Sequence, residues 1–561
     1  MRRQVGRNVV LAAIVVAGGA AIGGVLGGGV LADSQAEADP LRTFGQVLSL
    51  IEDRYPGKLE STEVVEGAIQ GMLRTLDPHS NYLTPESYND MREEQRGQFF
   101  GLGIQIAKRG QDLTVISPIE DTPADRAGLQ AGDVIHKIEG EPTAELSVQD
   151  AVRRLKGPEG SKVTITIRRP SDGSEFDVTI PRAAINLDSL RVAYMIAPDI
   201  GFVSLSSFTS TTARELDEAI SRLSKAGMKN LLLDLRDNPG GLLDQAVKVS
   251  ERFISEGRMV VYTRGRIAGS DQDYYAEDGG KRFSAPLVVL VNGGSASASE
   301  IVSGAVQDHD RGLVVGEVTF GKGLVQRVIP LRNGGALAVT TAKYYTPAGR
   351  LIQRDYSDID EYFLHRSEAE GDAPGEAEES GPQPAEPKPA GTVVPAERRE
   401  AFRTASGRVV YGGGGITPDY EVPTQRLPVL VARMLRDNLI FDFAVRYNAA
   451  HPELDKGFQL GAEHVEEYRK FLDQRGFEYE PAAFEEHREV IVRRLRAQVS
   501  RVRWGKIEEH RILAEEDPQI QKALAVFEEA ARLARAGASG TPGPDVAQAD
   551  DAKPKKGRAA R

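Results

Sequence analysis

The chain has 561 residues, which is too long for one ordinary domain, so a few domains are expected. Its composition, 40% hydrophobic and 27% charged, is typical of a globular protein. The net charge of −12 and the lack of a basic, aromatic-rich stretch argue against nucleic acid as a partner. The chain contains no cysteine, which excludes a thiol nucleophile, a thiolate metal site and a disulfide.

The first 39 residues predict a targeting segment and a polar spacer. Arg2, Arg3 and Arg7 precede an uncharged stretch from Val9 to Ala32 that is rich in Ala, Gly and Val. This pattern suits both a secretory signal and a membrane anchor, so cleavage stays open. Because the arginines stay inside in both cases, we expect the rest of the chain outside the cytoplasmic membrane, in the periplasm or cell envelope.

Residues 40–96 are predicted to form a helical region. Apolar residues recur at helical spacing from Phe44 to Ile51 and again from Val64 to Met72. The turn that follows contains His79 beside a proline. A histidine in such a turn is more often a structural hydrogen-bonding residue than a catalytic base, and we interpret His79 in that way.

Residues 97–182 are predicted to form a compact β domain, and residues 183–425 an α/β core. The β domain has a helix expected at residues 147–155 and strands expected at residues 104–107, 113–116, 134–138, 163–168 and 176–180. In the core, strands at residues 200–205, 230–235 and 287–291 alternate with helices near residues 213–224 and 243–253. That alternation predicts a layered α/β sheet.

An acidic, proline-rich stretch at residues 366–398 interrupts the core. It has too few apolar residues to fold, so we predict a disordered surface insertion. Residues 426–536 are predicted to form a helical domain, with amphipathic stretches at residues 427–446, 464–474, 484–502 and 520–535. Its many Arg and Glu residues predict a solvated face, with a homo-oligomer interface as the alternative. Residues 537–561 are Gly-, Pro- and Ala-rich and are predicted to be disordered.

The stretch from Val291 to Gln326 has the features that suggest chemistry. Ser297 and Glu300 have capping-box spacing, so a helix is predicted to begin near Ser297. A serine there lies beside unpaired N–H groups that can stabilise an oxyanion. Lys322 is flanked by glycines in an apolar segment, where desolvation disfavours the charged form, so it could serve as general base. Gln326, four residues later, is expected on the same face.

These residues also have plainer interpretations. Ser297 can be only an N-cap, because the capping-box pattern is common, and Lys322 can be only a solvated loop lysine. Periodicity does not choose among Ser295, Ser297 and Ser299. The sequence has no dinucleotide fingerprint, Walker loop or metal-ligand cluster, so no cofactor and no metal are expected.

Three runs in this stretch resemble one protein family: GSASASE, ending at Glu300; QDxxR, ending at Arg311; and GExTFGKGxVQ, ending at Gln326. They closely resemble the carboxyl-terminal processing proteases, also called tail-specific proteases, which are serine peptidases with a Ser-Lys dyad. The N-terminal helices with their LDPHS turn, and residues 407–420, resemble further parts of the same family. The pattern SPxxxxPAxxAGLxxGD, ending at Asp133, resembles a PDZ domain.

The resemblance implies an exported serine endopeptidase that cleaves proteins near their C-termini. The implied fold is multidomain α/β, with a layered crotonase- or Clp-like core, an inserted PDZ domain and helical N- and C-terminal regions. By position, Ser297 matches the nucleophile, Lys322 the base and Gln326 its orienting partner. The amide of Ala298, paired with a glycine of the Gly240-Gly241 turn, matches the oxyanion hole, and Gly240 is chosen by position.

The PDZ resemblance implies a peptide-binding loop made of Gly101, Leu102, Gly103 and Ile104. Its glycines let backbone N–H groups take a peptide's terminal carboxylate, and the peptide then adds as a strand beside residues 104–107. The expected partners are therefore protein or peptide substrates with free C-termini. Lys156 stands where relatives often have an arginine linked to coupling between the PDZ and protease parts. A lysine lacks the bidentate contact, so that role is in doubt.

Two rival functions fit parts of the sequence. A non-catalytic scaffold could use its PDZ and helical parts to bind envelope proteins, but a relict core has no reason to keep the Ser, Lys and Gln together. A crotonase-like acyl-CoA enzyme could have a similar layered core. As a cytoplasmic enzyme, it would need neither an export segment nor a PDZ domain. These motifs do not encode the physiological substrate, the oligomeric state or the means of activation.

Overall fold

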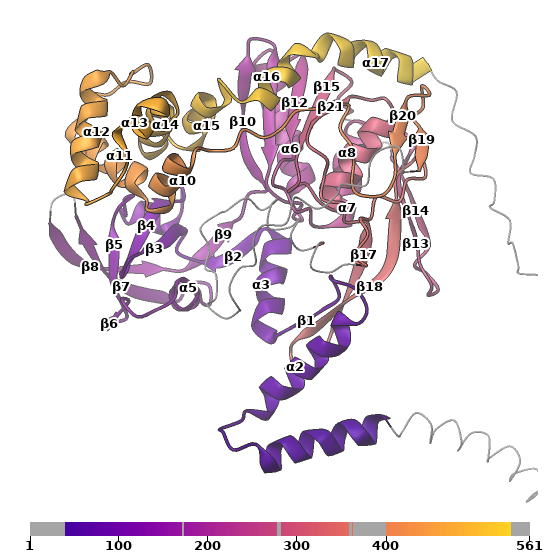
Figure 1. Cartoon of the computed structure of the whole chain (residues 1–561), viewed down its shortest axis with the longest axis horizontal. Helices are drawn as coiled ribbons and strands as arrows, with labels where there is room; N and C mark the ends of the chain where they lie inside the picture. The colour runs from indigo at the N-terminus through magenta and orange to yellow at the C-terminus, as the bar shows by residue number, and fades with distance from the viewer. Residues whose placement is uncertain (1–39, 171–172, 278–281, 358–361, 363–399, 540–561) are drawn as a thin grey trace, which may run out of the picture. The chain divides into compact units, whose positions relative to one another are not determined.

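The structure is a computed structural model that describes residues 40–170, 173–277, 282–357, 362 and 400–539 (Figure 1). The predicted targeting segment and the predicted acidic insertion lie outside these residues, as does most of the predicted tail. The chain divides into two units, residues 1–82 and 83–561, and each is described by itself. Within the described ranges, no helix is both long enough and apolar enough to span a lipid bilayer.

The first unit contains the two expected helices. Residues 40–54 are helical, and α2 is Ser61–Arg74. The turn after α2 is built around Asp77, whose Oδ1 accepts the N–H groups of His79 and Ser80, both at 2.8 Å. The Ser80 hydroxyl donates to Oδ2 of the same carboxylate at 2.7 Å. His79 therefore belongs to a hydrogen-bonded turn, as its structural interpretation requires.

The second unit begins with α3 (Pro85–Arg96) and then forms the β domain. All five expected strands are present as an antiparallel sheet in the order β3 (Ile104–Arg109), β4 (Asp112–Pro118), β5 (Val134–Ile138), β7 (Lys162–Arg169) and β8 (Ser174–Pro181), with β6 (Glu141–Pro142) beside β5. The expected helix is α5 (Val148–Leu155), and a short α4 (Pro123–Arg126) was not predicted. Because β3 lies at the edge of this sheet, its outer side can accept another strand.

The β domain is inserted between two strands that pair with each other. Its entry strand β2 (Gln98–Gly101) and exit strand β9 (Ala183–Asn186) form an antiparallel pair. Lys156, at the end of α5, lies over the Phe99 ring, and its ammonium donates to Glu93 of α3 at 2.7 Å. Lys156 therefore ties the β domain to α3 as a point charge.

The core is a six-stranded sheet in the order β10 (Leu190–Ala197), β11 (Ile200–Leu205), β12 (Asn230–Asp234), β15 (Leu287–Val291), β16 (Leu313–Gly316) and β21 (Tyr420–Glu421). Every pairing is parallel except β10 with β11. Since β21 joins this sheet, residues 407–420 return to the core as predicted.

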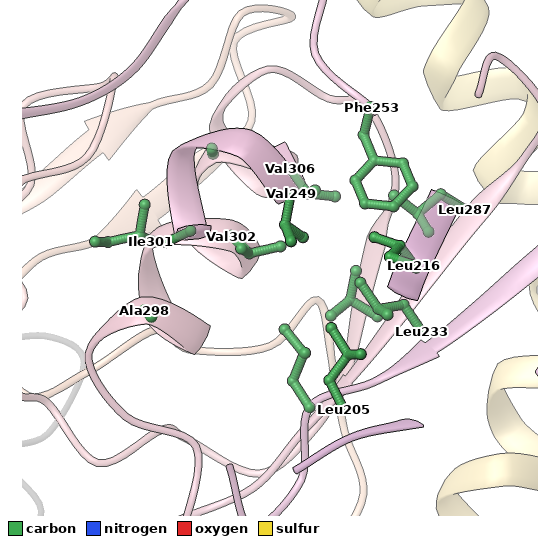
Figure 2. Packing of buried hydrophobic residues seen from close by; sticks show 14 of the residues in the cluster. Leu205, Leu216, Leu233, Val249, Phe253, Leu287, Ala298, Ile301, Val302 and Val306 are labelled. Carbon is green, nitrogen blue, oxygen red and sulfur yellow. The ribbon is translucent and has the colours of Figure 1, made fainter. Parts of the chain in front are cut away.

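One face of the core sheet is covered by α6 (Thr212–Lys225), α7 (Leu243–Glu251) and α8 (Ala298–Asp308). Figure 2 shows part of this packing, with Val302 and Val306 of α8 near Val249 of α7. The helix that begins after Ser297 is therefore held by the main hydrophobic core, which fixes the direction in which its N-terminus points.

The opposite face of the sheet is covered by C-terminal helices, a packing that was not predicted. Alternate strand residues such as Phe202, Leu232 and Val288 pack there against Ile520 and Phe527. The helices are α15 (Lys506–Ala514), α16 (Pro518–Ala525) and α17 (Phe527–Ser539). The physical reason is that buried parallel strands are apolar on both faces, so each face needs a covering layer.

The other C-terminal helices have a separate hydrophobic core: α10 (Val429–Arg436), α11 (Leu439–Ala450), α12 (Ala462–Gln474), α13 (Pro481–Glu486) and α14 (Arg488–Trp504). The amphipathic stretch expected at residues 427–446 forms two helices, because Asn438 between them adopts a left-handed conformation with φ of 57°. The helix expected at residues 520–535 likewise divides at Val526. Helix α15 was not predicted. Gly505, with φ of 83°, separates it from α14.

A second antiparallel sheet lies beside the core and was not predicted. It contains β13 (Met259–Arg264), β14 (Gln272–Tyr275), β17 (Leu324–Pro330) and β18 (Ala336–Tyr345). A separate hairpin pairs β19 (Ala401–Arg403) with β20 (Val409–Tyr411). β17 follows Lys322 directly, so this sheet positions the chain after the candidate base.

Candidate active site

The candidate residues gather where three neighbouring parallel strands end. β12, β15 and β16 run in the same direction side by side, so the loops after them leave the same edge of the sheet. These loops carry the Gly240-Gly241 turn, Ser297 and Lys322 respectively. Residues that are far apart in the sequence are thus brought to one edge by the sheet topology.

Ser297 is the N-cap of α8 and has an unusual backbone conformation, with φ of 54° and ψ of −110°. A positive φ in a residue other than glycine is strained and is maintained only by its surroundings. The flanking serines are fully buried and structural: the hydroxyl of Ser295 donates to the Leu235 carbonyl at 2.7 Å, and that of Ser299 donates to the Asn238 carbonyl at 2.9 Å. Ser297 alone of the three is partly exposed.

Glu300 joins the Ser297 turn to the Lys322 loop. Its buried carboxylate accepts the Ser297 N–H at 2.8 Å and the Lys322 N–H at 2.9 Å on Oε2. On Oε1 it accepts the Thr319 hydroxyl at 2.6 Å and the Gly321 N–H at 2.7 Å. Burial raises the pKa of Glu300, while these four hydrogen bonds act in the opposite direction because they favour the carboxylate.

Tyr344 of β18 makes a second connection between the same two segments. Its hydroxyl lies 3.1 Å from the Ser297 carbonyl oxygen and also contacts the Lys322 carbonyl oxygen. Burial raises the pKa of Tyr344 well above its ordinary value, so the hydroxyl stays protonated. Together, Glu300 and Tyr344 fix the backbones of Ser297 and Lys322 relative to each other.

The loop that carries Lys322 is also held from its outer side. The Phe320 N–H donates to the Ser295 carbonyl at 3.0 Å, and the Gly323 N–H donates to Oε1 of Gln353 at 2.8 Å. Gln326 lies in β17, where the pairing register with β18 shifts between Val325 and Gln326. Because Lys322 precedes the strand and a register shift follows, sequence spacing alone does not put Lys322 and Gln326 on one face.

The Gly240-Gly241 turn lies against Ser297. A Cβ on Gly240 would stand 2.8 Å from the Ser297 Cβ and 2.8 Å from the Ala298 nitrogen, so only glycine allows this approach. The turn is tied to the segment that carries Ser297 because the Ala296 N–H donates to the Asn238 carbonyl at 3.0 Å. The Gly240 N–H donates to Oδ1 of Asn238 at 2.9 Å, so this N–H already has a hydrogen-bond acceptor within the turn.

The predicted peptide-binding loop of the β domain leads into the edge strand β3. Gly103 has φ of +82°, and a Cβ there would stand 2.3 Å from the Thr122 Cβ. The carbonyls of this loop are turned inward, since the Leu102 carbonyl accepts the Ala124 N–H at 2.9 Å and the Gly103 carbonyl accepts the Ile119 N–H at 2.9 Å. Helix α5 packs beside β3.

Sequence reasoning missed several residues that build the site. Glu300 was noted only as half of a capping box, and Tyr344 and Asn238 were given no role. The one available signal was that Glu300 is a charged residue inside an otherwise apolar or small-residue helix. No cluster of three or more potential metal ligands occurs among the residues that the structure describes.

Comparison with known protein families gives four matches along the chain. Residues 199–361 match peptidase family S41, and residues 114–169 match a PDZ domain. Residues 30–87 match the N-terminal domain of the activating protease CtpB, and residues 430–486 match the C-terminal helical domain of a probable PDZ-protease. These matches define the class of protein as a serine peptidase with a PDZ domain.

The chain is also similar to individual proteins. A carboxy-terminal-processing protease of Bartonella bacilliformis is 43% identical over 317 residues, which cover 56% of this chain and 72% of the relative. A probable CtpA-like serine protease of Staphylococcus saprophyticus is 35% identical over 323 residues, covering 56% of this chain and 64% of the relative. The solved photosystem II D1 C-terminal processing protease is 32% identical, with 54% of this chain and 82% of that chain covered and a TM-score of 0.32. The chain belongs to the carboxy-terminal-processing protease family.

The contact at Gly240 generates a prediction about the active site. Gly240→Ala should lower kcat/KM on the order of 100-fold, because the added Cβ forces the turn away from Ser297. Gly227→Ala is the matched control, since Gly227 has a similar φ of +98° and no described atom within 4 Å of its Cβ position. Gly227→Ala should lower only the free energy of unfolding, by about 1–2 kcal/mol, because alanine is strained at this φ. Equal losses of activity in the two folded variants would show that the contact with Ser297 is unimportant.

Proposed function

We propose that this serine peptidase cleaves proteins near their C-termini with a Ser297-Lys322 dyad. Neutral Lys322 would accept the proton of the Ser297 hydroxyl as Ser297 attacks the substrate carbonyl. Gln326 would orient the Lys322 side chain. As the C–N bond breaks, protonated Lys322 would give its proton to the leaving amine and become neutral again. It would then take a proton from the water that attacks the acyl-enzyme and return that proton to the Ser297 oxygen as the new carboxylic acid leaves.

The observation that best supports this proposal is the shared carboxylate of Glu300. It accepts the N–H groups of both Ser297 and Lys322, so the chain uses a costly buried charge to hold these two residues together. A simple N-cap needs no such connection to a distant loop. The strained backbone of Ser297 is also typical of a functional position.

The oxyanion of the tetrahedral intermediate would be held by backbone N–H groups. Ala298 is the first residue of α8, where N–H groups have no intrahelical partner and the helix dipole favours negative charge. The second donor would come from the Gly240-Gly241 turn. Gly241 is the better candidate, since the Gly240 N–H is already directed at Asn238.

We further propose that the PDZ domain selects substrates by their C-termini. The edge position of β3 and the glycine loop before it support strand addition with the terminal carboxylate in the loop. The arginines and uncharged stretch of residues 1–32 support action outside the cytoplasmic membrane. We also propose that the layered α/β core has a crotonase- or Clp-like fold.

The dyad can be tested by substitution. Ser297→Ala and Lys322→Ala should abolish cleavage of an unstructured protein followed by mass spectrometry, and Lys322→Arg should do the same because arginine stays protonated. Ser295→Ala and Ser299→Ala are matched controls that should retain cleavage, with a loss of stability of about 1 kcal/mol from each lost hydrogen bond. Full activity in folded Ser297→Ala protein would end the assignment.

The protonation state of the base gives a second test. Activity should rise with pH through one ionisation below pH ~10.4, at which an ordinary lysine loses its proton, because Lys322 must be neutral to accept one. The measurement is kcat/KM against pH with a peptide substrate that does not itself titrate. A profile that falls with rising pH over that range would contradict a lysine base.

Recognition of the terminus can be tested with a matched pair of peptides. A substrate that ends in a free carboxylate and an apolar residue should be cut with a higher kcat/KM than its amide, since amidation removes only the charge. Gly103→Ala should abolish this difference, whereas Gly110→Ala, with φ of +60° and no described atom near its Cβ position, should preserve it. Equal values for acid and amide in the unmodified enzyme would mean that the PDZ domain does not read the terminus.

A further inference from the structure

Arg236 connects the active-site turn to the C-terminal helices. It lies just after β12, immediately before the segment Asp237 to Gly241. On one side, its Nε and Nη2 donate to the two oxygens of Asp234 at 3.0 and 2.8 Å. On the other side, its Nη1 donates to Oδ2 of Asp517 at 2.7 Å and to Oε1 of Gln519 at 2.9 Å. The guanidinium is thus held between the core sheet and α16.

This contact is buried and charged. The Arg236 side chain is 14% exposed and that of Asp234 is 5% exposed. Burial by itself would lower the pKa of Arg236, but the carboxylates of Asp234 and Asp517 outweigh it and raise the pKa. Arg236 therefore stays charged, and loss of a partner would leave a buried charge incompletely compensated.

Helix α16 is anchored independently of Arg236. Oδ1 of Asp517 caps the helix by accepting the N–H groups of Gln519 and Ile520 at 2.9 and 3.1 Å. The Gln519 amide also donates to the Val422 carbonyl at 2.8 Å. Ile520 is buried in the hydrophobic layer on the second face of the sheet. The two side chains that hold Arg236 therefore project from a fixed support.

The turn after Arg236 needs such support because its backbone is strained. Asp237 has φ of 54°, which is strained in a residue other than glycine, whereas the φ of 99° at Gly240 and 144° at Gly241 are values that glycine adopts readily. On the side of the nucleophile, the turn is held by Asn292, whose Oδ1 accepts the Asp237 N–H at 2.9 Å. The Arg236 contacts hold the other end, where the turn leaves β12.

We propose that Asp517 and Gln519 are positioning residues for the oxyanion-binding turn, so that α16 is a required part of the active site. This inference rests on the proposed role of the Gly240-Gly241 turn. It assigns the C-terminal helices a part in catalysis beyond covering the sheet. A purely structural ion pair would lower stability when broken but would leave the turnover of the remaining folded enzyme unchanged.

The main test is Asp517→Asn, which keeps a capping oxygen and removes the charge that faces Arg236. With a peptide substrate at a temperature where the variant is folded, kcat should fall roughly 10- to 100-fold, and KM should stay within about twofold, because the turn contacts the oxyanion and not the bound ground state. Gln519→Ala is a second variant that leaves the Asp517 cap intact. It should lower kcat in the same direction and carries the test if Asp517→Asn does not fold.

The matched control is Glu529→Gln, which removes the charge from a different polar contact between the core and the C-terminal helices. The Tyr420 hydroxyl donates to Glu529 of α17 at 2.5 Å, and neither residue touches Arg236. This variant should keep the kcat of the unmodified enzyme. An unchanged kcat in folded Asp517→Asn and Gln519→Ala, or an equal loss in Glu529→Gln, would overturn the positioning role. Activity in Ser297→Ala would instead overturn the dyad, so the two failures are distinguishable.

Discussion

The site depends on one buried carboxylate, that of Glu300. Burying a charge costs free energy unless hydrogen bonds replace its lost hydration, and Glu300 accepts four of them. Two of those donors are the backbone N–H groups of Ser297 and Lys322. Ser297 lies in the segment after β15, and Lys322 lies in the loop after β16. The free energy of these contacts is what maintains the strained Ser297 turn and aligns it with the Lys322 loop.

The sheet determines where the active-site loops lie, and the hydrogen bonds of Glu300 then align two of these loops. Parallel neighbours β12, β15 and β16 bring three loops to one edge, and α8 is fixed by the core below it. The C-terminal helices α16 and α17 close the second face of the same sheet. Support for the active-site turns therefore comes from both faces, which explains how a helical region without any catalytic motif contacts the turn through Arg236.

Much of this could be predicted from the sequence, because local patterns encode it. Periodicity predicted the PDZ strands and the main core strands, and capping-box spacing predicted a helix beginning near Ser297; the structure contains all of these. The packing of α16 on the core was not predictable in this way, since amphipathic spacing shows that a helix buries one face but not against what. The roles of Glu300 and Tyr344 were also missed, because they depend on contacts between residues 22 and 47 positions apart in the sequence.

The most direct test of the central role of Glu300 is the rate at which a fluorophosphonate labels Ser297 in Glu300→Gln, with the labelled residue identified by mass spectrometry. The glutamine amide group would face two donors that the carboxylate oxygen accepts, so labelling should slow roughly 10- to 100-fold in folded protein. Glu317→Gln is the control, because Glu317 lies in the loop that carries Lys322 but makes a different contact. Its Oε1 accepts the Thr424 N–H at 2.7 Å. It should label at the unmodified rate. Labelling of folded Glu300→Gln at the unmodified rate, or labelling at a residue other than Ser297 in the unmodified enzyme, would contradict this account.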